Sequence, residues 1–284
     1  AAALETALIG ALADTYGTAN TTALVVVQDG RLVAERYAEG FGPDTPQRTW
    51  SVAKSLAGTL IGWAAHRMGG LDVNAPSSVP EWSAPGDPRA AITLDNLMRM
   101  ASGLTSDTAG NRTDALYFGG VTIAEQATTW PLIAAPDSRY RYANNDTLLA
   151  VHSLSDFFAT NPPAAFFDRL GMVDTTAETD WRGGYMLSSQ VWSTARDLAR
   201  FGQLYVQDGV WEGERLLPEN WRAYVSEPSG PQPNGALGYG ATFWLMNRSN
   251  GVPADTISAN GNRGQYVIIV PSRNIVIVRR GEDA

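Results

Sequence analysis

The segment Trp50-Ser51-Val52-Ala53-Lys54-Ser55 contains the only lysine of the 284 residues, whereas the other 20 basic side chains are arginine. An arginine guanidinium stays protonated in proteins, but a lysine amine can lose its proton when it is desolvated. The single lysine therefore occupies a position where it can act as a base. One helical turn places Ser51 and Lys54 on the same face, so the amine can take the hydroxyl proton. The spacing is that of a Ser-x-x-Lys catalytic pair.

Periodicity divides the chain into strand-rich ends and a helical middle. The N-terminal part is expected to contain a helix over Leu4 to Tyr16 and two strands, Ala23 to Gln28 and Leu32 to Tyr37, joined by the hairpin signal Asp29-Gly30. The middle is expected to contain helices over Ser51 to Met68, Leu94 to Ala101 behind a Thr93 cap, Thr122 to Thr129, and Asp146 to Phe158. After Asp180 we expect helices over Thr194 to Asp208 and Pro218 to Val225, and strands over Tyr239 to Met246, Gln265 to Val270 and Ile275 to Arg279.

Strands at both ends of a helical block predict an α+β fold, with one antiparallel sheet built from both termini. We expect a discontinuous α/β sheet domain over residues 1–50 and 182–284, and a mainly helical domain over residues 51–181. A cleft between the two domains is the expected active site.

Composition excludes several classes of partner. The chain is 44% hydrophobic and 18% charged, as in soluble globular proteins, and no stretch approaches 18 apolar residues. We therefore expect no membrane span. A net charge of -8 without a basic run argues against nucleic acid as a partner. The sequence leaves the oligomeric state unknown, and it leaves the compartment open between the cytoplasm and the periplasm or secretion after signal removal.

Metal, cofactor and histidine chemistry have little support in the sequence. Cysteine is absent, and the two histidines, His66 and His152, are far apart and belong to no H-E-x-x-H motif. We expect neither a metal nor a cofactor. A Ser-His-Asp triad lacks its G-x-S-x-G elbow, so we expect structural or surface roles for both histidines.

A second candidate motif is Tyr140-Arg141-Tyr142-Ala143-Asn144-Asn145, which precedes a predicted helix. A tyrosine near a Ser-Lys pair can act as a base or proton shuttle, and an asparagine can position a carbonyl group or the lysine. The alternative is that Tyr142 packs its ring and Asn144 caps the helix.

A third candidate is Gly261-Asn262-Arg263-Gly264-Gln265, directly before an apolar strand. Glycines at a strand end allow close approach of the backbone to a ligand, and an edge N–H can join the Ser51 N–H in an oxyanion hole. The alternative is a plain hairpin turn.

In this order, the three motifs resemble the serine β-lactamase and DD-peptidase superfamily, and most closely the 6-aminohexanoate-dimer (nylon oligomer) hydrolases and esterases of its class C-like branch. The resemblance covers nearly the whole chain. It includes five further segments: the hairpin Val25 to Tyr37, Leu97 to Leu104, Phe167 to Met172, the helix Ser193 to Gly202, and the closing hairpin through Val270-Pro271-Ser272-Arg273. It implies a β-lactamase/transpeptidase-like fold.

The resemblance also implies roles for individual residues. Ser51 would be the acylated nucleophile, Lys54 its base, Tyr142 the proton shuttle and Asn144 a positioning residue. The N–H groups of Ser51 and Gln265 would form the oxyanion hole. The expected substrate is a small-molecule carboxylic ester or short linear amide, with 6-aminohexanoate-type oligomers included.

Two departures from the family pattern are relevant. The penicillin-recognising members carry Lys-Thr-Gly on the third strand, and the notable triplet here is Asn262-Arg263-Gly264. Strong β-lactamase activity is therefore not expected. Arg263 can bind a substrate carboxylate or form a surface salt bridge. The family usually continues beyond the last strand into a helix on the sheet, so we expect either that this helix lies outside the sequence or that the N-terminal helix covers the face alone.

Two other functions stay open at this point. The same fold serves penicillin-binding or sensor modules that acylate slowly or only bind a ligand. A conventional His-dependent hydrolase is the third alternative.

Overall fold

The computed structural model describes residues 2–13, 19–105 and 113–284. Its N-terminal helix α1 spans Ala2–Leu12. Most of the expected helix over Leu4 to Tyr16 is therefore present, and its last three residues lie outside the described part.

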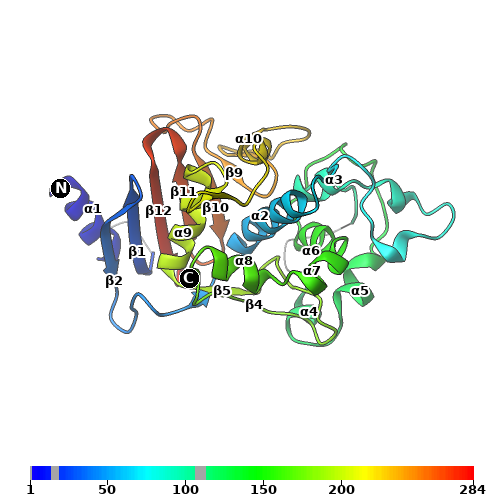
Figure 1. Ribbon diagram of the computed structural model, residues 1–284, viewed down its shortest axis with the longest axis horizontal. Helices are drawn as coiled ribbons and strands as arrows, with labels where there is room; N and C mark the ends of the chain where they lie inside the picture. Colours follow the sequence, from blue (N-terminus) through cyan, green and yellow to red (C-terminus); the bar gives the residue numbers. More distant parts are fainter. Residues whose placement is uncertain (1, 14–18, 106–112) are drawn as a thin grey trace.

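The centre of the fold is a seven-stranded antiparallel sheet with the order β2-β1-β12-β11-β10-β9-β8 (Figure 1). Its strands, in spatial order, are β2 (Arg31–Tyr37), β1 (Thr21–Gln28), β12 (Ile275–Gly281), β11 (Gln265–Val270), β10 (Ile257–Gly261), β9 (Trp244–Leu245) and β8 (Gly238–Tyr239). The last strand pairs with the first, with Val25 opposite Val278. The predicted α+β class and the sheet built from both termini are confirmed.

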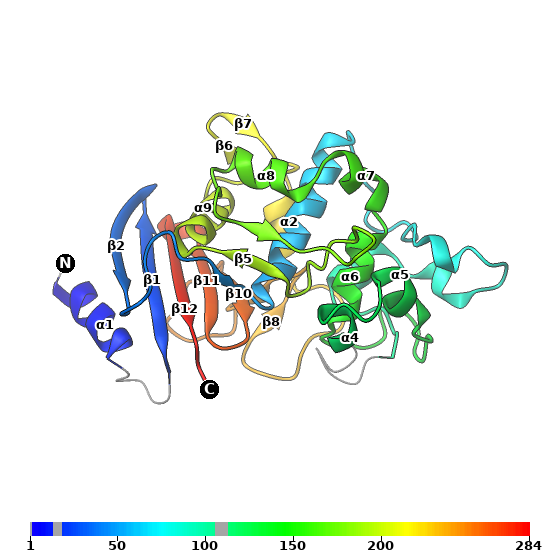
Figure 2. The same cartoon turned by 90° about the horizontal axis from the view of Figure 1, so that it is seen from below.

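Helices cover both faces of this sheet. Helix α9 (Ala195–Val206) lies on one face, where Gly202 permits close contact with Val276 and Val267. Helix α1 lies on the other face beside β1 and β2 (Figure 2), and its Leu8 packs against Leu24 and Val26. Successive side chains of β1 point to opposite faces of the sheet, so this apolar strand contacts the helix layers on both faces.

The remaining helices lie beyond the sheet as seen from α1, some of them beside the sheet and others at the far end of the molecule (Figure 1). They are α2 (Val52–Arg67), α3 (Leu94–Met98), α4 (Asp114–Tyr117), α5 (Ile123–Gln126), α6 (Asn144–His152), α7 (Ser155–Thr160), α8 (Pro163–Arg169) and α10 (Trp221–Ser226). Short 3₁₀ turns span Pro80–Trp82, Pro88–Ala91, Ala127–Thr129 and Pro271–Arg273.

Helix α2 connects the sheet to the helical part and is buried from Val52 to Ala65. It approaches its neighbours closely at two glycines: a side chain at Gly58 would collide with Thr242, and one at Gly62 would collide with the Trp221 ring. The helix that carries Ser51 and Lys54 is thus fixed by packing on all sides.

Two small sheets complete the structure. One contains β3 (Gln47–Arg48), β5 (Val191–Ser193) and β4 (Thr176–Ala177), and the other pairs β6 (Val210–Trp211) with β7 (Glu214–Arg215). Within the described ranges, no helix combines the length and apolar character that crossing a membrane requires.

Three elements of the structure differ most from the prediction. Strand β10 has the sequence Ile-Ser-Ala-Asn-Gly and was not predicted, because its small polar residues have low strand propensity and only its neighbours in the sheet make it a strand. The expected helix over Asp146 to Phe158 is divided into α6 and α7. The expected strand over Tyr239 to Met246 is the β8–β9 hairpin, in which Thr242 has a φ of +66°.

Candidate active site

Ser51 lies at a sharp turn between β3 and α2. The preceding Trp50 has a φ of +51°, a left-handed conformation that is uncommon for a bulky residue and must be held by its surroundings. The Thr49 N–H donates to the Val191 carbonyl (2.8 Å), and the Ala53 N–H donates to the Trp50 carbonyl (3.0 Å). Ser51 is the N-cap residue of α2, but its side chain makes no capping hydrogen bond. Its hydroxyl is therefore free to interact with Lys54.

Lys54 is 1% exposed, and its amine has three polar neighbours. Nζ lies 2.5 Å from Asn144 Oδ1, 2.8 Å from the Ser188 carbonyl oxygen and 3.0 Å from Ser51 Oγ. All three are neutral groups, and desolvation lowers the pKa of Lys54 from its ordinary 10.5 to about 7. The amine is thus able to exist as a neutral base near pH 7.

Tyr142 contacts the same hydroxyl from the segment before α6. Its phenol interacts with the Ser51 side chain, and its ring centroid lies 5.1 Å from Lys54 Nζ. Burial raises the pKa of Tyr142 to about 12, although the interaction with Ser51 opposes this rise. The phenol is therefore protonated at neutral pH and can donate a proton. Its ring packs against Tyr239 and Trp244.

Asn144 is the first residue of α6 and is buried. Its Oδ1 accepts a hydrogen bond from Lys54, and its Nδ2 donates to Thr113 Oγ1 (3.1 Å). These two bonds fix the orientation of the amide. The N-cap residue of α6 is Ala143, so Asn144 holds the lysine and does not cap the helix.

Ser51, Tyr142 and Asn144 line an open cavity of about 690 Å³. Aromatic and polar side chains share its wall, among them residues from β3, α4, the 188–190 loop and the β10–β11 turn. The remaining lining residues are Arg48, Trp50, Asp114, Tyr117, Phe118, Ser189, Gln190, Leu237, Trp244, Asn260, Gly261, Asn262 and Tyr266.

The structure does not bring Gln265 or Arg263 to this cavity. Gln265 is buried, and its side chain accepts from Arg280 Nε (2.7 Å) and donates to the Gly281 carbonyl (2.6 Å). Arg263 is exposed, and its Nε donates to the Asp283 carbonyl (3.2 Å). Neither belongs to the cavity wall. The third motif is thus the hairpin turn that was its alternative interpretation, and Gln265 and Arg263 do not line the cavity as the site interpretation expected.

Strand β10 occupies that place instead. A side chain at Gly261 would collide with the Thr49 carbonyl and come within 3.2 Å of the Ser51 nitrogen. The end of β10 therefore lies directly beside the nucleophile. The triplet Asn262-Arg263-Gly264 forms the β10–β11 turn, so the strand residues that face the site are Asn260 and Gly261.

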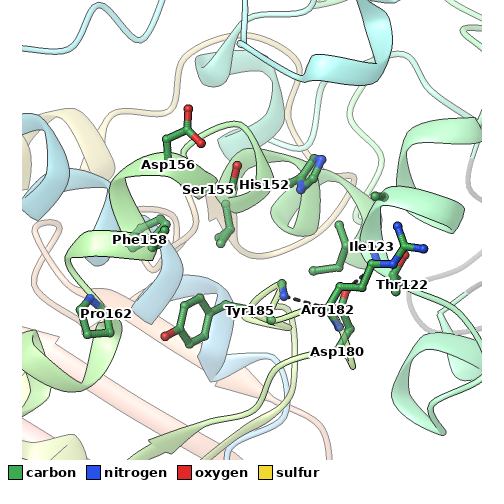
Figure 3. A pocket seen from close by; sticks show the side chains of 15 residues that line it. Thr122, Ile123, His152, Ser155, Asp156, Phe158, Pro162, Asp180, Arg182 and Tyr185 are labelled. Atoms are coloured by element: carbon green, nitrogen blue, oxygen red, sulfur yellow. Dashed lines mark hydrogen bonds between the residues drawn. The ribbon is translucent and has the colours of Figure 1, made fainter.

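Neither histidine lines the cavity of Ser51. His66 is in the last turn of α2, at the opposite end from Ser51. The His152 ring pairs with Glu81 (3.0 Å) and borders a separate hollow of about 370 Å³ (Figure 3). A His-dependent hydrolase thus has no geometric support in the described residues.

In the hollow of Figure 3, the acidic side chain Asp180 has a structural role. The Asp180 carboxylate accepts hydrogen bonds from the backbone N–H groups of Ile123 (2.8 Å), Arg182 (2.9 Å) and Gly184 (2.9 Å). This carboxylate is satisfied by the protein itself. Among the residues that the structure describes, no group of three or more His, Cys, Asp or Glu side chains is placed to hold a metal ion.

Sequence reasoning missed two residues of the site, Ser188 and Arg48. The Ser188 carbonyl binds Lys54, and the Ser188 hydroxyl is hydrogen-bonded to the Tyr117 hydroxyl (2.6 Å). Every residue has a backbone carbonyl group, so no sequence pattern indicated that Ser188 would bind Lys54. Arg48 precedes the first motif by three residues and was not singled out either.

Comparison with known proteins shows the family of this chain. The sequence model of the Beta-lactamase family matches residues 9–279. The chain belongs to the beta-lactamase family. It is 27% identical to the 6-aminohexanoate-dimer hydrolase of Paenarthrobacter ureafaciens over 295 aligned positions, which cover 91% of this chain and 72% of that protein. This family member is therefore a β-lactamase-fold hydrolase related to 6-aminohexanoate-dimer hydrolase.

Solved structures show the same fold. A Bacillus anthracis protein assigned as a 6-aminohexanoate-dimer hydrolase superposes with a TM-score of 0.77 at 24% identity, over 93% of this chain and 74% of that one. A β-lactamase/D-alanine carboxypeptidase from Pseudomonas syringae superposes with a TM-score of 0.73 at 14% identity, over 99% and 94% of the two chains. The β-lactamase/transpeptidase-like fold of this family member is confirmed.

Proposed function

We propose that the protein is a serine hydrolase that forms an acyl-enzyme on Ser51, with Lys54 as the base and Tyr142 as the proton donor to the leaving group. The observation that carries this proposal is the hydrogen-bonding of Lys54 Nζ. A neutral amine has two N–H donors and one lone pair. The Asn144 and Ser188 oxygens take the two donors, so the lone pair is left for the Ser51 hydroxyl.

The acylation half-reaction begins when Ser51 Oγ attacks the carbonyl carbon of an ester or amide and its proton passes to Lys54. A tetrahedral intermediate forms with negative charge on the former carbonyl oxygen. The bond to the alcohol or amine breaks as Tyr142 delivers a proton to that leaving group. Lys54 then returns a proton to Tyr142.

The deacylation half-reaction uses water as the nucleophile. Water adds to the acyl carbon, one of its protons passes to the base, and Ser51 Oγ leaves with a proton. The products are a carboxylic acid and the regenerated serine. This chemistry requires neither a metal nor a cofactor.

The oxyanion hole consists of the Ser51 N–H and the N–H of Asn262, the first residue after β10. Support for this assignment is the contact of Gly261 with the Ser51 nitrogen and the position of Asn262 on the cavity wall. Asn262 replaces Gln265, which does not line the cavity. Two converging N–H groups stabilise developing negative charge in a site that is partly shielded from water.

Carboxylic esters and short linear amides are the substrates that fit this site, and 6-aminohexanoate-type oligomers belong to that class. The relative in Paenarthrobacter ureafaciens and the absence of a lysine from β10 support this choice. β-Lactams are expected to react more slowly than small esters, and a faster β-lactam turnover would contradict the assignment.

Labelling with a fluorophosphonate followed by intact-mass analysis tests the mechanism. The expected result is one adduct on wild-type protein, mapped to Ser51 and absent from Ser51→Ala. Ser155→Ala alters a serine in the separate hollow of Figure 3, so it is the matched control and should label fully. Absence of label on folded wild-type protein contradicts the proposal. If the wild-type protein is labelled on Ser51 but the unlabelled protein hydrolyses no ester, the sensor module is favoured instead.

A further inference from the structure

Arg48 is the only cationic side chain on the wall of the Ser51 cavity within the described residues. It lies on β3, three residues before the nucleophile, and is half-buried. Its guanidinium carbon lies 3.7 Å from the centroid of the Trp50 ring. Nη2 donates to Ser189 Oγ (2.9 Å), and Nε donates to the Ser189 carbonyl (3.5 Å). The planar group is therefore held in one orientation at the edge of the cavity.

No carboxylate among the described residues forms an ion pair with Arg48. Glu178 is the carboxylate whose charge acts on Arg48. Its side chain accepts hydrogen bonds from other groups, Gln190 Nε2 (3.0 Å) and Trp192 Nε1 (2.8 Å). Desolvation lowers the pKa of the Arg48 guanidinium from its ordinary value. By contrast, several other arginines in the described residues have a carboxylate partner, as Arg196 has Glu35 (2.7 Å).

Stacking on Trp50 and the bonds to Ser189 leave donors available. The structure records no hydrogen bond from Arg48 Nη1 in the described part of the chain, so this nitrogen and the second proton of Nη2 can bind a ligand. An arginine fixed by stacking is suited to bidentate binding of a carboxylate. Asp114, the one acidic residue that the described part of the chain places on this wall, is exposed at the start of α4. It favours a ligand whose anionic end is directed away from it.

We infer that the substrate carries a carboxylate group, which Arg48 binds while Ser51 attacks an ester or amide bond elsewhere in the same molecule. This inference rests on the proposed function and specifies its substrate class: half-esters or half-amides of dicarboxylic acids, and amides or esters whose leaving group is an acid. Arg48 therefore takes the role that sequence reasoning had offered to Arg263.

Two matched pairs of esters test the inference. In the first pair, mono-4-nitrophenyl glutarate has a carboxylate on the acyl side and 4-nitrophenyl butyrate has none. In the second pair, 4-(butyryloxy)benzoate has a carboxylate on the leaving group, and its methyl ester is neutral. For wild-type protein, one of the two acids should exceed its neutral partner in kcat/KM by about tenfold or more, mainly through KM. The variants Arg48→Gln and Arg48→Lys should reduce this ratio toward one, with the lysine variant intermediate.

Arg273→Gln is the matched control, because Arg273 is an exposed arginine in the β11–β12 turn, and its ratios should equal those of wild type. Thermal unfolding checks that each variant is folded. Ratios near one in wild type for both pairs, or ratios that Arg48→Gln does not change, overturn the inference. An equal loss of activity on all four esters in Arg48→Gln shows that Arg48 only supports the turn before Ser51.

A binding measurement separates this inference from the catalytic proposal. Glutarate should quench or shift the tryptophan fluorescence of Ser51→Ala, because Trp50 lies against Arg48, and glutaramide should bind at least about tenfold more weakly. If wild type hydrolyses no ester but glutarate binding depends on Arg48, the catalytic proposal fails and the carboxylate site stands. If glutarate and glutaramide bind equally, the carboxylate site is overturned.

Discussion

Lys54 Nζ and Ser51 Oγ are 3.0 Å apart, and the remaining bonds of the amine to Asn144 and Ser188 orient it toward that hydroxyl. The arrangement matches a neutral amine whose lone pair accepts the serine proton. The same burial that excludes water from Lys54 lowers its pKa to about 7. The position of the Lys54 amine and its lowered pKa therefore both favour its role as the base for Ser51.

The pH dependence of ester hydrolysis should report this amine. We expect kcat/KM to rise with pH through an apparent pKa near 7 and to fall about tenfold per pH unit below it, because only the deprotonated Lys54 accepts the proton. Initial rates from pH 5 to 9 measure the profile. Burial raises the pKa of Asp146 to about 7 as well, so Asp146→Asn is the control and should retain the same profile. A profile that disappears in that variant would assign the titration to Asp146.

Substitution of Lys54 by arginine should abolish general-base catalysis, since a guanidinium stays protonated. We expect a loss of about 10²–10⁴-fold in kcat for 4-nitrophenyl butyrate, and a similar loss for Lys54→Met. Circular dichroism establishes whether each variant is folded. Retention of more than a tenth of the activity in folded Lys54→Arg would show that another group is the base.

The loss of kcat in Tyr142→Phe should depend on the leaving group of the substrate. The hydroxyl of Tyr142 has a pKa raised to about 12, so its function is to donate a proton. Alkyl esters and amides need that proton and should lose about 10²–10⁴-fold in kcat. Nitrophenolate leaves without it, so 4-nitrophenyl esters should lose much less. An equal loss for both classes would indicate a role in positioning Ser51.

Gly261→Ala tests the oxyanion hole. The added methyl group would collide with the Thr49 carbonyl and crowd the Ser51 nitrogen, so it should displace the two N–H groups. We expect kcat to fall about 10²–10³-fold. Gly235→Ala is the matched control, because a methyl group there meets nothing within 4 Å. Full activity in Gly261→Ala would place the oxyanion hole elsewhere.

Asp146 should make stability depend on pH. Its pKa in the folded protein is raised to about 7 by burial, so its favourable contribution is complete below the unfolded pKa of about 3.9 and is lost as pH rises through about 7. Asp146→Asn cannot ionise and can still accept the hydrogen bond from Ser102 Oγ. The melting temperature of this variant relative to wild type should therefore be higher at pH 8 than at pH 5. A pH-independent difference between the two proteins would contradict this.

Local patterns were sufficient for several features of the fold. The hairpin of β1 and β2, helix α2 and the turn at Pro271–Arg273 follow from residues that are adjacent in sequence. The division into α6 and α7 and the strand β10 were missed, because each depends on what packs beside it. Ile257–Gly261 has little intrinsic preference for a strand, but hydrogen bonds from β9 and β11 impose one.

The sequence alone determined the identity of the Ser51–Lys54 pair, since two residues one helical turn apart must lie together and only lysine can lose its proton. It also indicated that Tyr142 and Asn144 were candidates. Only the tertiary structure decided that they meet Lys54, that Ser188 supplies a carbonyl group, and that Gly261 and Arg48, not Gln265 and Arg263, border the cavity. The physical reason is that Tyr142, Asn144, Ser188 and Gly261 are about 90 to 210 positions from Ser51, so their contacts depend on tertiary packing and strand register, which a local pattern does not specify. Arg48 is close to Ser51 in sequence, but the same packing decides that it borders the cavity.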